Sequence, residues 1–182
     1  MAISHELKKA IVELPQKEKD KLLLRLISKD KNLVQRFEFE LIEHGDTIQP
    51  RRDDIKKRIL KVAQMPHDTP GWMMMDMRSF MGDITQHVKI TKDKYGEIEL
   101  MIYLFLTFFE HQSPLLKVHN SRSDTCAEYI AKKTEALLKK SAKFNPDYYI
   151  DFERDMQRLL EYVHTHCPKN YAHTMGIPKS WP

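Results

Sequence analysis

The fold class follows most directly from residues 69–88, which read TPGWMMMDMRSFMGDITQHV. The stretch opens with Thr69-Pro70, a strong helix start because proline at the first helical position loses no hydrogen bond. Six apolar side chains then keep to one face of a helix for about four turns. They are Met73, Met77, Phe80, Met81, Ile84 and Val88. This pattern predicts a long amphipathic helix.

Helical patterns continue on both sides of this stretch. Further helices are expected over residues 4–14, 16–29, 32–44, 50–65, 97–113, 124–142 and 146–166. The chain has only 5 glycines among 182 residues, against about 13 at an average usage of about 7%. Sheet proteins need glycine at turns and bulges. We therefore predict an all-α protein of about eight helices in antiparallel pairs, an arrangement that an α-α superhelix would also satisfy.

The segment 87–100 has two interpretations. Residues 88–91 and 97–100 alternate between apolar and polar side chains, as in a β-hairpin. However, the apolar stripe from Met73 continues through Val88 in helical phase, and a second helical stripe runs from Ile98 to Phe109. We favour two helices that are joined near residues 93–96.

The predicted helices form one domain, 1–182, whose tail 168–182 is irregular. Three apolar residues of the tail are candidates to dock on the body: Tyr171, Ile177 and Trp181. Ten further side chains are expected in the core: Leu23, Leu26, Phe37, Ile59, Phe80, Ile84, Met101, Phe105, Leu137 and Leu159.

The compartment suggested by the sequence is the cytoplasm. The first residues contain no apolar segment after a basic start, as a signal peptide would. The longest apolar run, residues 100–109, is about half the length of a membrane span. The two cysteines, Cys126 and Cys167, are too few for a disulfide framework, so both are expected as free thiols.

One block carries a family resemblance. Residues 14–33 read LPQKEKDKLLLRLISKDKNL, with two amphipathic segments around Asp30. The block resembles helix pairs in irregular HEAT-like helical-repeat proteins of bacteria, where a short turn containing Asp separates two helices. The resemblance implies an α-α superhelix and no catalytic residues.

The strongest metal-ligand candidates lie near the C-terminus, at His164, His166 and Cys167, with His173 six residues later. Imidazole and thiolate together suit zinc. His166 points away from the helix face that the other two share, and the chain has no second cysteine pair at finger spacing. We favour histidines that interact with the dipole at a helix end, and expect no metal or other cofactor.

Catalytic side chains are not evident either. The acidic row Asp147, Asp151 and Asp155 repeats every four residues but lacks the Glu-x-x-His motif of di-metal bundles, so we interpret it as a solvated face. Cys126 lies near a helix start, which would lower its pKa if the thiol were exposed. No histidine has a spacing that nominates it as a partner for this thiol. We name no catalytic residue, and we rank an enzyme or metal protein without a recognisable motif third among the function classes.

Basic side chains form the most evident polar surface. Five lysines of the helix 124–142 and its end fall within an arc of about 120° at 100° per residue. They are Lys132, Lys133, Lys139, Lys140 and Lys143. A second basic group, between Arg51 and Lys61, is interrupted by Asp53 and Asp54. Such faces can contact phosphates, but neither contains an aromatic residue for base stacking, and we favour solvated faces.

The methionines of residues 73–81 mostly belong to the core stripe. Trp72 and Met75 fall off it, and an exposed methionine beside an aromatic ring suits an adaptable binding surface. Our leading hypothesis is a non-enzymatic module that binds another protein through Trp72, Met75 and Tyr103. Nucleic-acid binding through the lysines of 132–143 is the alternative, and no membrane partner is expected.

Overall fold

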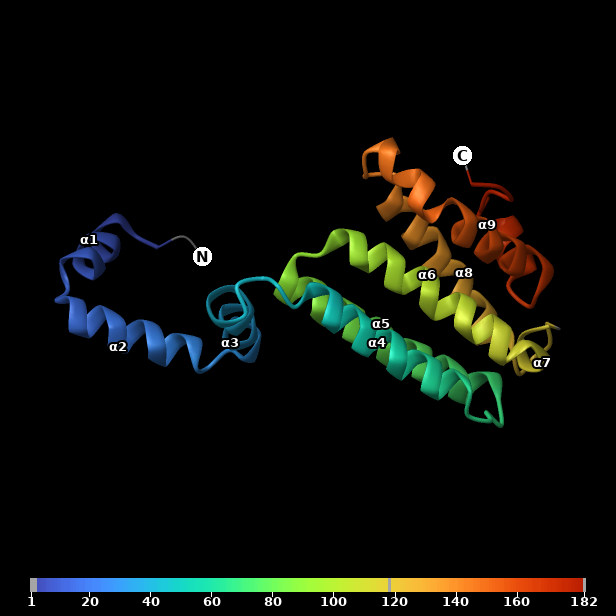
Figure 1. The fold of residues 1–182 in the computed structure, drawn as a ribbon, viewed down its shortest axis with the longest axis horizontal. Helices are drawn as coiled ribbons and strands as arrows, with labels where there is room; N and C mark the ends of the chain where they lie inside the picture. The colour runs from blue at the N-terminus through green and yellow to red at the C-terminus, as the bar shows by residue number, and fades with distance from the viewer. Residues whose placement is uncertain (1–2, 118, 182) are drawn as a thin grey trace. The chain divides into compact units, whose positions relative to one another are not determined.

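The computed structural model describes residues 3–117 and 119–181, and its regular structure is helical throughout, with no strand among those residues. The described chain contains ten α-helices, α1 to α10. Figure 1 shows the course of the chain and labels α1 to α9. The predicted all-α fold is confirmed. The chain divides into two compact units, Met1–Thr47 with Lys89–Thr91, and Ile48–Val88 with Lys92–Pro182.

Unit 1 consists of short helices. They are α1 (His5–Glu13), α2 (Gln16–Ile27), α3 (Lys31–Phe37) and the π-helix η1 (Glu38–Ile42). Ser4 caps α1 by accepting a hydrogen bond from the backbone N–H of Leu7 at 3.2 Å. Asp30 caps α3, because its carboxylate accepts hydrogen bonds from the N–H groups of Asn32 and Leu33 at 2.8 and 3.3 Å.

The burial expected for unit 1 is wrong at three positions. Leu23 and Leu26 are exposed, since α1, α2 and α3 contain no buried residue. Phe37 is half-buried, and the fully buried ring is Phe39. The π-helix explains this exchange, because its wider turn shifts the phase in which side chains face inward.

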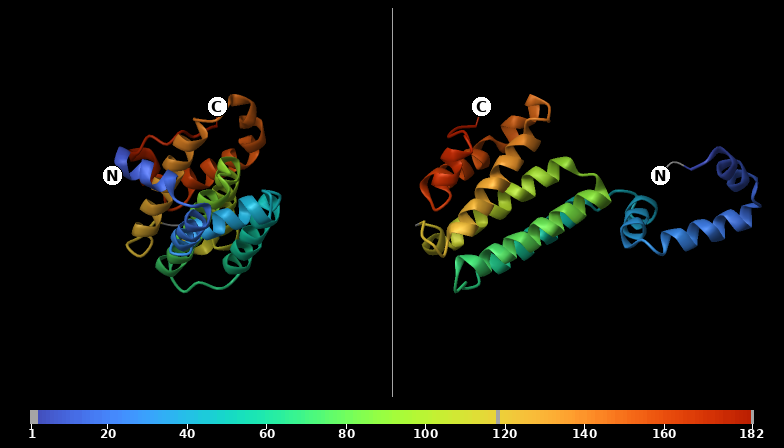
Figure 2. Two further views of the ribbon diagram at one scale, coloured as in Figure 1. Left: turned by 90° about the vertical axis from the view of Figure 1, so that its left-hand side faces the viewer. Right: turned by 180° about the vertical axis from the view of Figure 1, so that it is seen from behind.

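Unit 2 contains the long helices. They are α4 (Ile48–Ala63), α5 (Pro70–Thr91, whose last three residues cluster with unit 1), α6 (Lys94–His111), α7 (Ser113–Leu116), α8 (Asp124–Ser141), the 3₁₀-helix η2 (Pro146–Tyr148), α9 (Tyr149–Thr165) and α10 (Lys169–Thr174). Figures 1 and 2 show α4, α5 and α6 running side by side, with α8 and α9 on the other side of α6.

The segment 87–100 is a helix–turn–helix, as favoured from the sequence. Helix α5 ends at Thr91, and Lys92 takes the left-handed conformation with φ 59°. Asp93 then caps α6 by accepting a hydrogen bond from the N–H of Gly96 at 2.9 Å. The β-hairpin alternative is therefore wrong.

Helix α6 is the centre of the core of unit 2. It contacts α4, α7, α8 and α9, and eleven of its residues are buried. A helix that is apolar on almost every side is stable only where neighbours cover it all round. Seven expected core residues of unit 2 are confirmed as buried: Ile59, Phe80, Ile84, Met101, Phe105, Leu137 and Leu159.

The tail after residue 168 is less irregular than expected, because it contains α10. Its three candidate docking residues do contact the core: Ile177 is buried, and Tyr171 and Trp181 pack half-buried against it. Among the described residues, no helix combines the length and apolar character needed to cross a membrane.

Candidate functional site

Two large apolar side chains at the start of α5 project into solvent. Thr69 caps the helix through the N–H of Trp72 at 3.3 Å, and this sets the phase of the first turn. In that phase Met73, Met74 and Met77 are buried, whereas Trp72 is 68% exposed and Met75 is 53% exposed. Trp72 and Met75 are three residues apart and therefore neighbours on the helix surface. The sequence prediction that these two residues leave the core stripe is confirmed.

A pocket of about 360 Å³ lies between α4 and α5 on the same side of α5. Its lining includes the apolar side chains of Val62, Met65 and Phe80. Asp76 and Ser79 of the lining follow Trp72 and Met75 by four residues each, so the exposed pair extends the pocket wall toward the start of α5.

Opposite charges border this pocket. The guanidinium of Arg58 on α4 donates to Asp83 on α5 at 2.5 Å and to Asp54 at 3.0 Å. On the α5 side, Nε2 of His67 lies 3.0 Å from a carboxylate oxygen of Asp76. We define the α4–α5 surface as this pocket together with Trp72 and Met75. It combines an apolar centre with charges of both signs at the border.

Tyr103, the third expected partner-binding residue, lies on a different helix. It is half-buried on α6 and packs against the core. The ammonium of Lys56 lies 5.5 Å from the centre of its ring. Tyr103 is thus partly covered, whereas Trp72 and Met75 are open to solvent.

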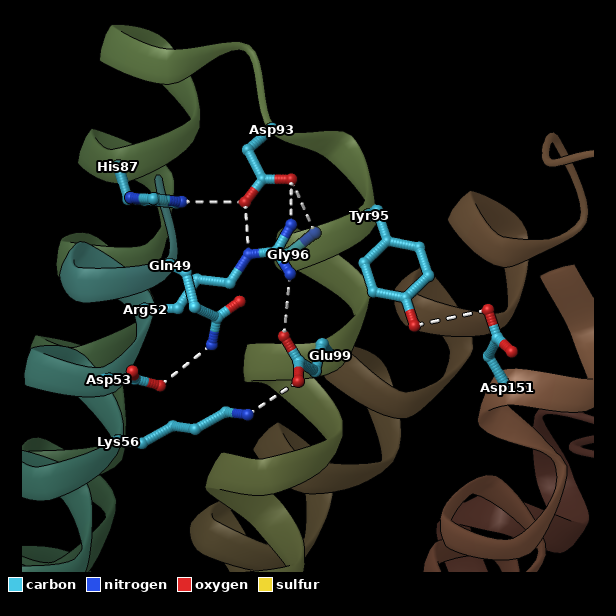
Figure 3. A network of polar contacts seen from close by, with 10 residues as sticks. All are labelled: Gln49, Arg52, Asp53, Lys56, His87, Asp93, Tyr95, Gly96, Glu99 and Asp151. Atoms are coloured by element: carbon cyan, nitrogen blue, oxygen red, sulfur yellow. Dashed lines mark hydrogen bonds and ion pairs between the residues drawn. The ribbon is translucent and has the colours of Figure 1, made fainter. Parts of the chain in front are cut away.

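A second candidate site is a buried polar cluster around Asp93, where α5 passes into α6 (Figure 3). Arg52 on α4 donates twice to the carboxylate, from Nε to Oδ2 and from Nη2 to Oδ1, both at 2.6 Å. Nε2 of His87 donates to Oδ2 at 3.0 Å, and the N–H of Gly96 donates to Oδ1 at 2.9 Å. Only 5% of the Asp93 side chain is exposed.

These donors determine the protonation of Asp93. Burial by itself raises the pKa of a carboxyl group, but the hydrogen bonds from His87, Arg52 and Gly96 outweigh that effect. The pKa of Asp93 is therefore held well below its usual range. The four hydrogen bonds also occupy the roughly four acceptor positions of a carboxylate, which leaves no position for a substrate or a metal.

Arg52 also connects the cluster to Glu99 of α6, which lies three residues, about one helix turn, after Gly96. Nη1 of Arg52 lies 3.2 Å from Glu99, and Nζ of Lys56 donates to the same carboxylate at 2.6 Å. The guanidinium also lies 5.2 Å from the centre of the Tyr95 ring, whose hydroxyl donates to Asp151 of α9 at 3.3 Å. Because the partners named here all belong to helices of unit 2 or to the α5–α6 turn, we interpret this cluster as the connection between α4, that turn and α6.

The sequence alone does not predict this cluster. Arg52, Lys56 and Arg58 belong to the basic group between Arg51 and Lys61, but all three make ion pairs with carboxylates of α4, α5, α6 or the α5–α6 turn. The available signal was local: an Asp followed three residues later by Gly at the start of an apolar helix is consistent with an N-cap. The partners on α4 are more than forty residues away, so no local pattern joins them.

The lysine face of α8 is partly neutralised. Lys132 pairs with Glu128 and Lys139 with Glu135, each at 2.6 Å, and Lys140 pairs with Glu97 of α6. Lys133 lies 5.7 Å from the centre of the Tyr129 ring, and Lys143 is exposed. Three of the five lysines thus have carboxylate partners, which weakens the field that a phosphate backbone would meet.

The candidate zinc ligands have separate environments. Nε2 of His164 lies 3.1 Å from the backbone carbonyls of Ile177 and Pro178, which accept its hydrogen bond. The His166 ring packs against Tyr162 and Phe109, and burial is the main cause that lowers its pKa. Cys167 is fully buried. In the parts of the chain that the structure describes, no three potential ligands gather as a metal site would require.

The thiols and the acidic row also have ordinary structural environments. Cys126 is buried rather than exposed, and burial, together with the nearby Cys167, raises its pKa to about 12. An activated nucleophile at this helix start is therefore excluded. Along the acidic row, Asp151 accepts the hydroxyl of Tyr95, and Asp155 lies 3.5 Å from Arg158.

Comparisons with protein-family models, with curated proteins and with solved structures found no match to this chain.

Proposed function

We propose that this protein is a non-enzymatic, cytoplasmic interaction module, and that unit 2 binds an amphipathic helix of a partner protein on the α4–α5 surface. The observation that carries the proposal is the exposure of Trp72, 68%, directly beside Met75, 53% exposed. A tryptophan ring contributes more binding energy than almost any other side chain when a partner covers it. The unbranched methionine beside it can adapt to the partner's shape.

The pocket beside these residues supports a helical partner. A helix that binds in a groove places apolar side chains three or four residues apart into it. Val62, Met65 and Phe80 line the pocket, and Trp72 and Met75 continue its α5 wall over a further turn. The charges at the border favour a partner helix whose polar face carries both acidic and basic residues.

The HEAT-like architecture suggested by residues 14–33 belongs to the same proposal, since helical-repeat proteins use extended helix surfaces for binding. Side chains and backbone of unit 2 donate four hydrogen bonds to the Asp93 carboxylate, which supports a structural rather than a catalytic role for the cluster around Asp93.

The first experiment identifies the partner and tests the surface together. A photo-crosslinking amino acid replaces Met75 in one preparation and Ile150 in a matched control, because Ile150 is 75% exposed on α9. Both proteins are irradiated in a lysate of the source organism. We expect one protein to crosslink at position 75 and not at position 150. Equal crosslinking at both positions would contradict a specific surface.

The second experiment measures affinity with the purified partner. Trp72→Ala should weaken binding by about 30-fold or more, the factor that corresponds to a hot spot of about 2 kcal/mol. Ile150→Ala should leave affinity unchanged, and both variants should unfold at the same urea concentration as the unchanged protein. An unchanged affinity of Trp72→Ala would reject the α4–α5 surface as the binding site.

A further inference from the structure

Unit 1 exposes more apolar surface than its size explains. Thirteen large hydrophobic side chains of the described chain are exposed, and eight of them belong to residues 3–42. They are Ile3, Leu7, Val12, Leu23, Leu24, Leu26, Leu41 and Ile42. Clustered exposed apolar residues of this kind are typical of interaction surfaces.

The helices of unit 1 also need such cover for their own stability. Helices α1, α2 and α3 have 9, 12 and 7 residues and contain no buried side chain. Isolated helices shorter than about 12–15 residues are marginal in water, and most helices gain their stability by packing an amphipathic face. The apolar faces of α1 and α2 are therefore expected to pack against a further apolar surface.

The charge distribution of residues 1–47 indicates which surface covers the apolar faces of α1 and α2. Residues 1–31 carry eight lysines and arginines against five acidic residues, whereas residues 32–47 carry one arginine against four acidic residues. The two segments have net charges of +3 and −3, so residues 1–47 are neutral as a whole. A surface with a basic half and an acidic half is complementary to a second copy of itself turned by 180°.

We propose that unit 1 is a self-association surface, and that two copies of this chain form a symmetric dimer through it. In this dimer α2 of one copy, with exposed Leu23 and Leu26, packs against the acidic segment of its partner, which exposes Leu41 and Ile42. The twofold axis repeats this contact, so each copy contributes α2 to one contact and the acidic segment to the other. The proposal is independent of the α4–α5 surface, which belongs to unit 2.

The first test measures the mass of the full chain in solution by light scattering after gel filtration. We expect twice the chain mass of 21.6 kDa at tens of micromolar protein. Leu23→Asp with Leu26→Asp should reduce the mass to that of one chain, whereas Ile150→Asp, at a still more exposed position of unit 2, should leave the dimer intact. A wild-type mass of one chain, or an unchanged dimer in the Leu23/Leu26 variant, would overturn the proposal.

The second test uses charge reversal and holds even if the aspartate variant does not fold. One protein carries Lys19→Glu with Arg25→Glu, and the other carries Glu38→Lys with Glu40→Lys. Each should be monomeric alone, because both symmetric contacts then join like charges. Mixed in equal amounts, they should form a species of twice the chain mass, since both contacts between the two different variants join opposite charges. A mixture that remains monomeric contradicts the pairing of the two halves.

Discussion

Arg52 and Asp93 form a bidentate ion pair across 41 residues of sequence, with both N–O distances at 2.6 Å. The side chains are 13% and 5% exposed, so the pair is shielded from water. Removing one member of a buried pair leaves the other charge without compensation, so we expect substitutions in this pair to destabilise unit 2 strongly.

Arg52→Met should lower the free energy of unfolding by about 3–5 kcal/mol, because it leaves the Asp93 carboxylate buried without its main partner. Lys139→Met is the matched control, since its partner Glu135 lies on the surface of the same helix. An exposed pair of that kind contributes about 0.2–1 kcal/mol. Urea unfolding followed by circular dichroism measures both, and equal losses would show that the Arg52 pair contributes no more than a surface contact.

The contribution of Asp93 should depend on pH. Its pKa is lower in the folded protein than the value of about 3.9 in the unfolded chain. The unfolded state therefore binds the proton more readily, and the stabilisation is lost as the pH falls. We compare the free energies of unfolding of the wild type and Asp93→Asn. The wild type should exceed the variant by the full difference above about pH 5, and by a decreasing difference below about pH 4. A difference in unfolding free energy that stays constant from neutral to acidic pH would contradict this assignment.

Two glycines should respond to alanine in opposite directions. A Cβ at Gly96 would overlap Asp93 and Arg52, so Gly96→Ala must displace the buried ion pair and should strongly destabilise the protein. Gly82, in the middle of α5, has no neighbour within 4 Å of the added carbon. Gly82→Ala should stabilise the fold by about 0.5–1 kcal/mol through helix propensity. Thermal unfolding of both variants tests the contrast, and a tolerated Gly96→Ala would show that the cluster can rearrange.

Both thiols should be unreactive in the native protein. Burial raises the pKa of Cys126 and of Cys167 to about 12, so almost no thiolate exists at mildly alkaline pH. A thiol-reactive dye should label neither cysteine at pH 8 until urea unfolds the chain, when both should react at the rate of a free thiol. Rapid labelling of the folded protein would show that the core around α8 opens.

The lysine face should not bind nucleic acid specifically. Three of its lysines pair with glutamates, and we expect the wild type to bind single or double strands no more tightly than about 1 μM at 150 mM salt, within the usual non-specific range. Lys132→Glu with Lys139→Glu and Lys143→Glu should then change affinity little. A tighter, salt-dependent affinity that these changes abolish would support the nucleic-acid alternative.

Local sequence determined much of the fold and part of the candidate site. Helix boundaries followed from residues that act on the adjacent backbone, such as Thr69-Pro70 at the start of α5 and Ser4 before α1. The phase of the stripe in 73–88 also separated buried Met77 from exposed Trp72 and Met75, because helix geometry alone decides which side chains share a face. The exposed pair could therefore be predicted before its surroundings were known.

Tertiary structure decided everything that depends on a distant partner. Leu23 of α2 and Phe105 of α6 both belong to apolar stripes at helical spacing, yet Leu23 is exposed and Phe105 is buried, because α6 has neighbours on several sides and α2 does not. Arg52 belongs to a basic stretch in the sequence, but the fold directs it to Asp93. Periodicity specifies which side of a helix is apolar; whether that side is covered, and whether a charge meets its counterion, depends on residues far along the chain or on another molecule.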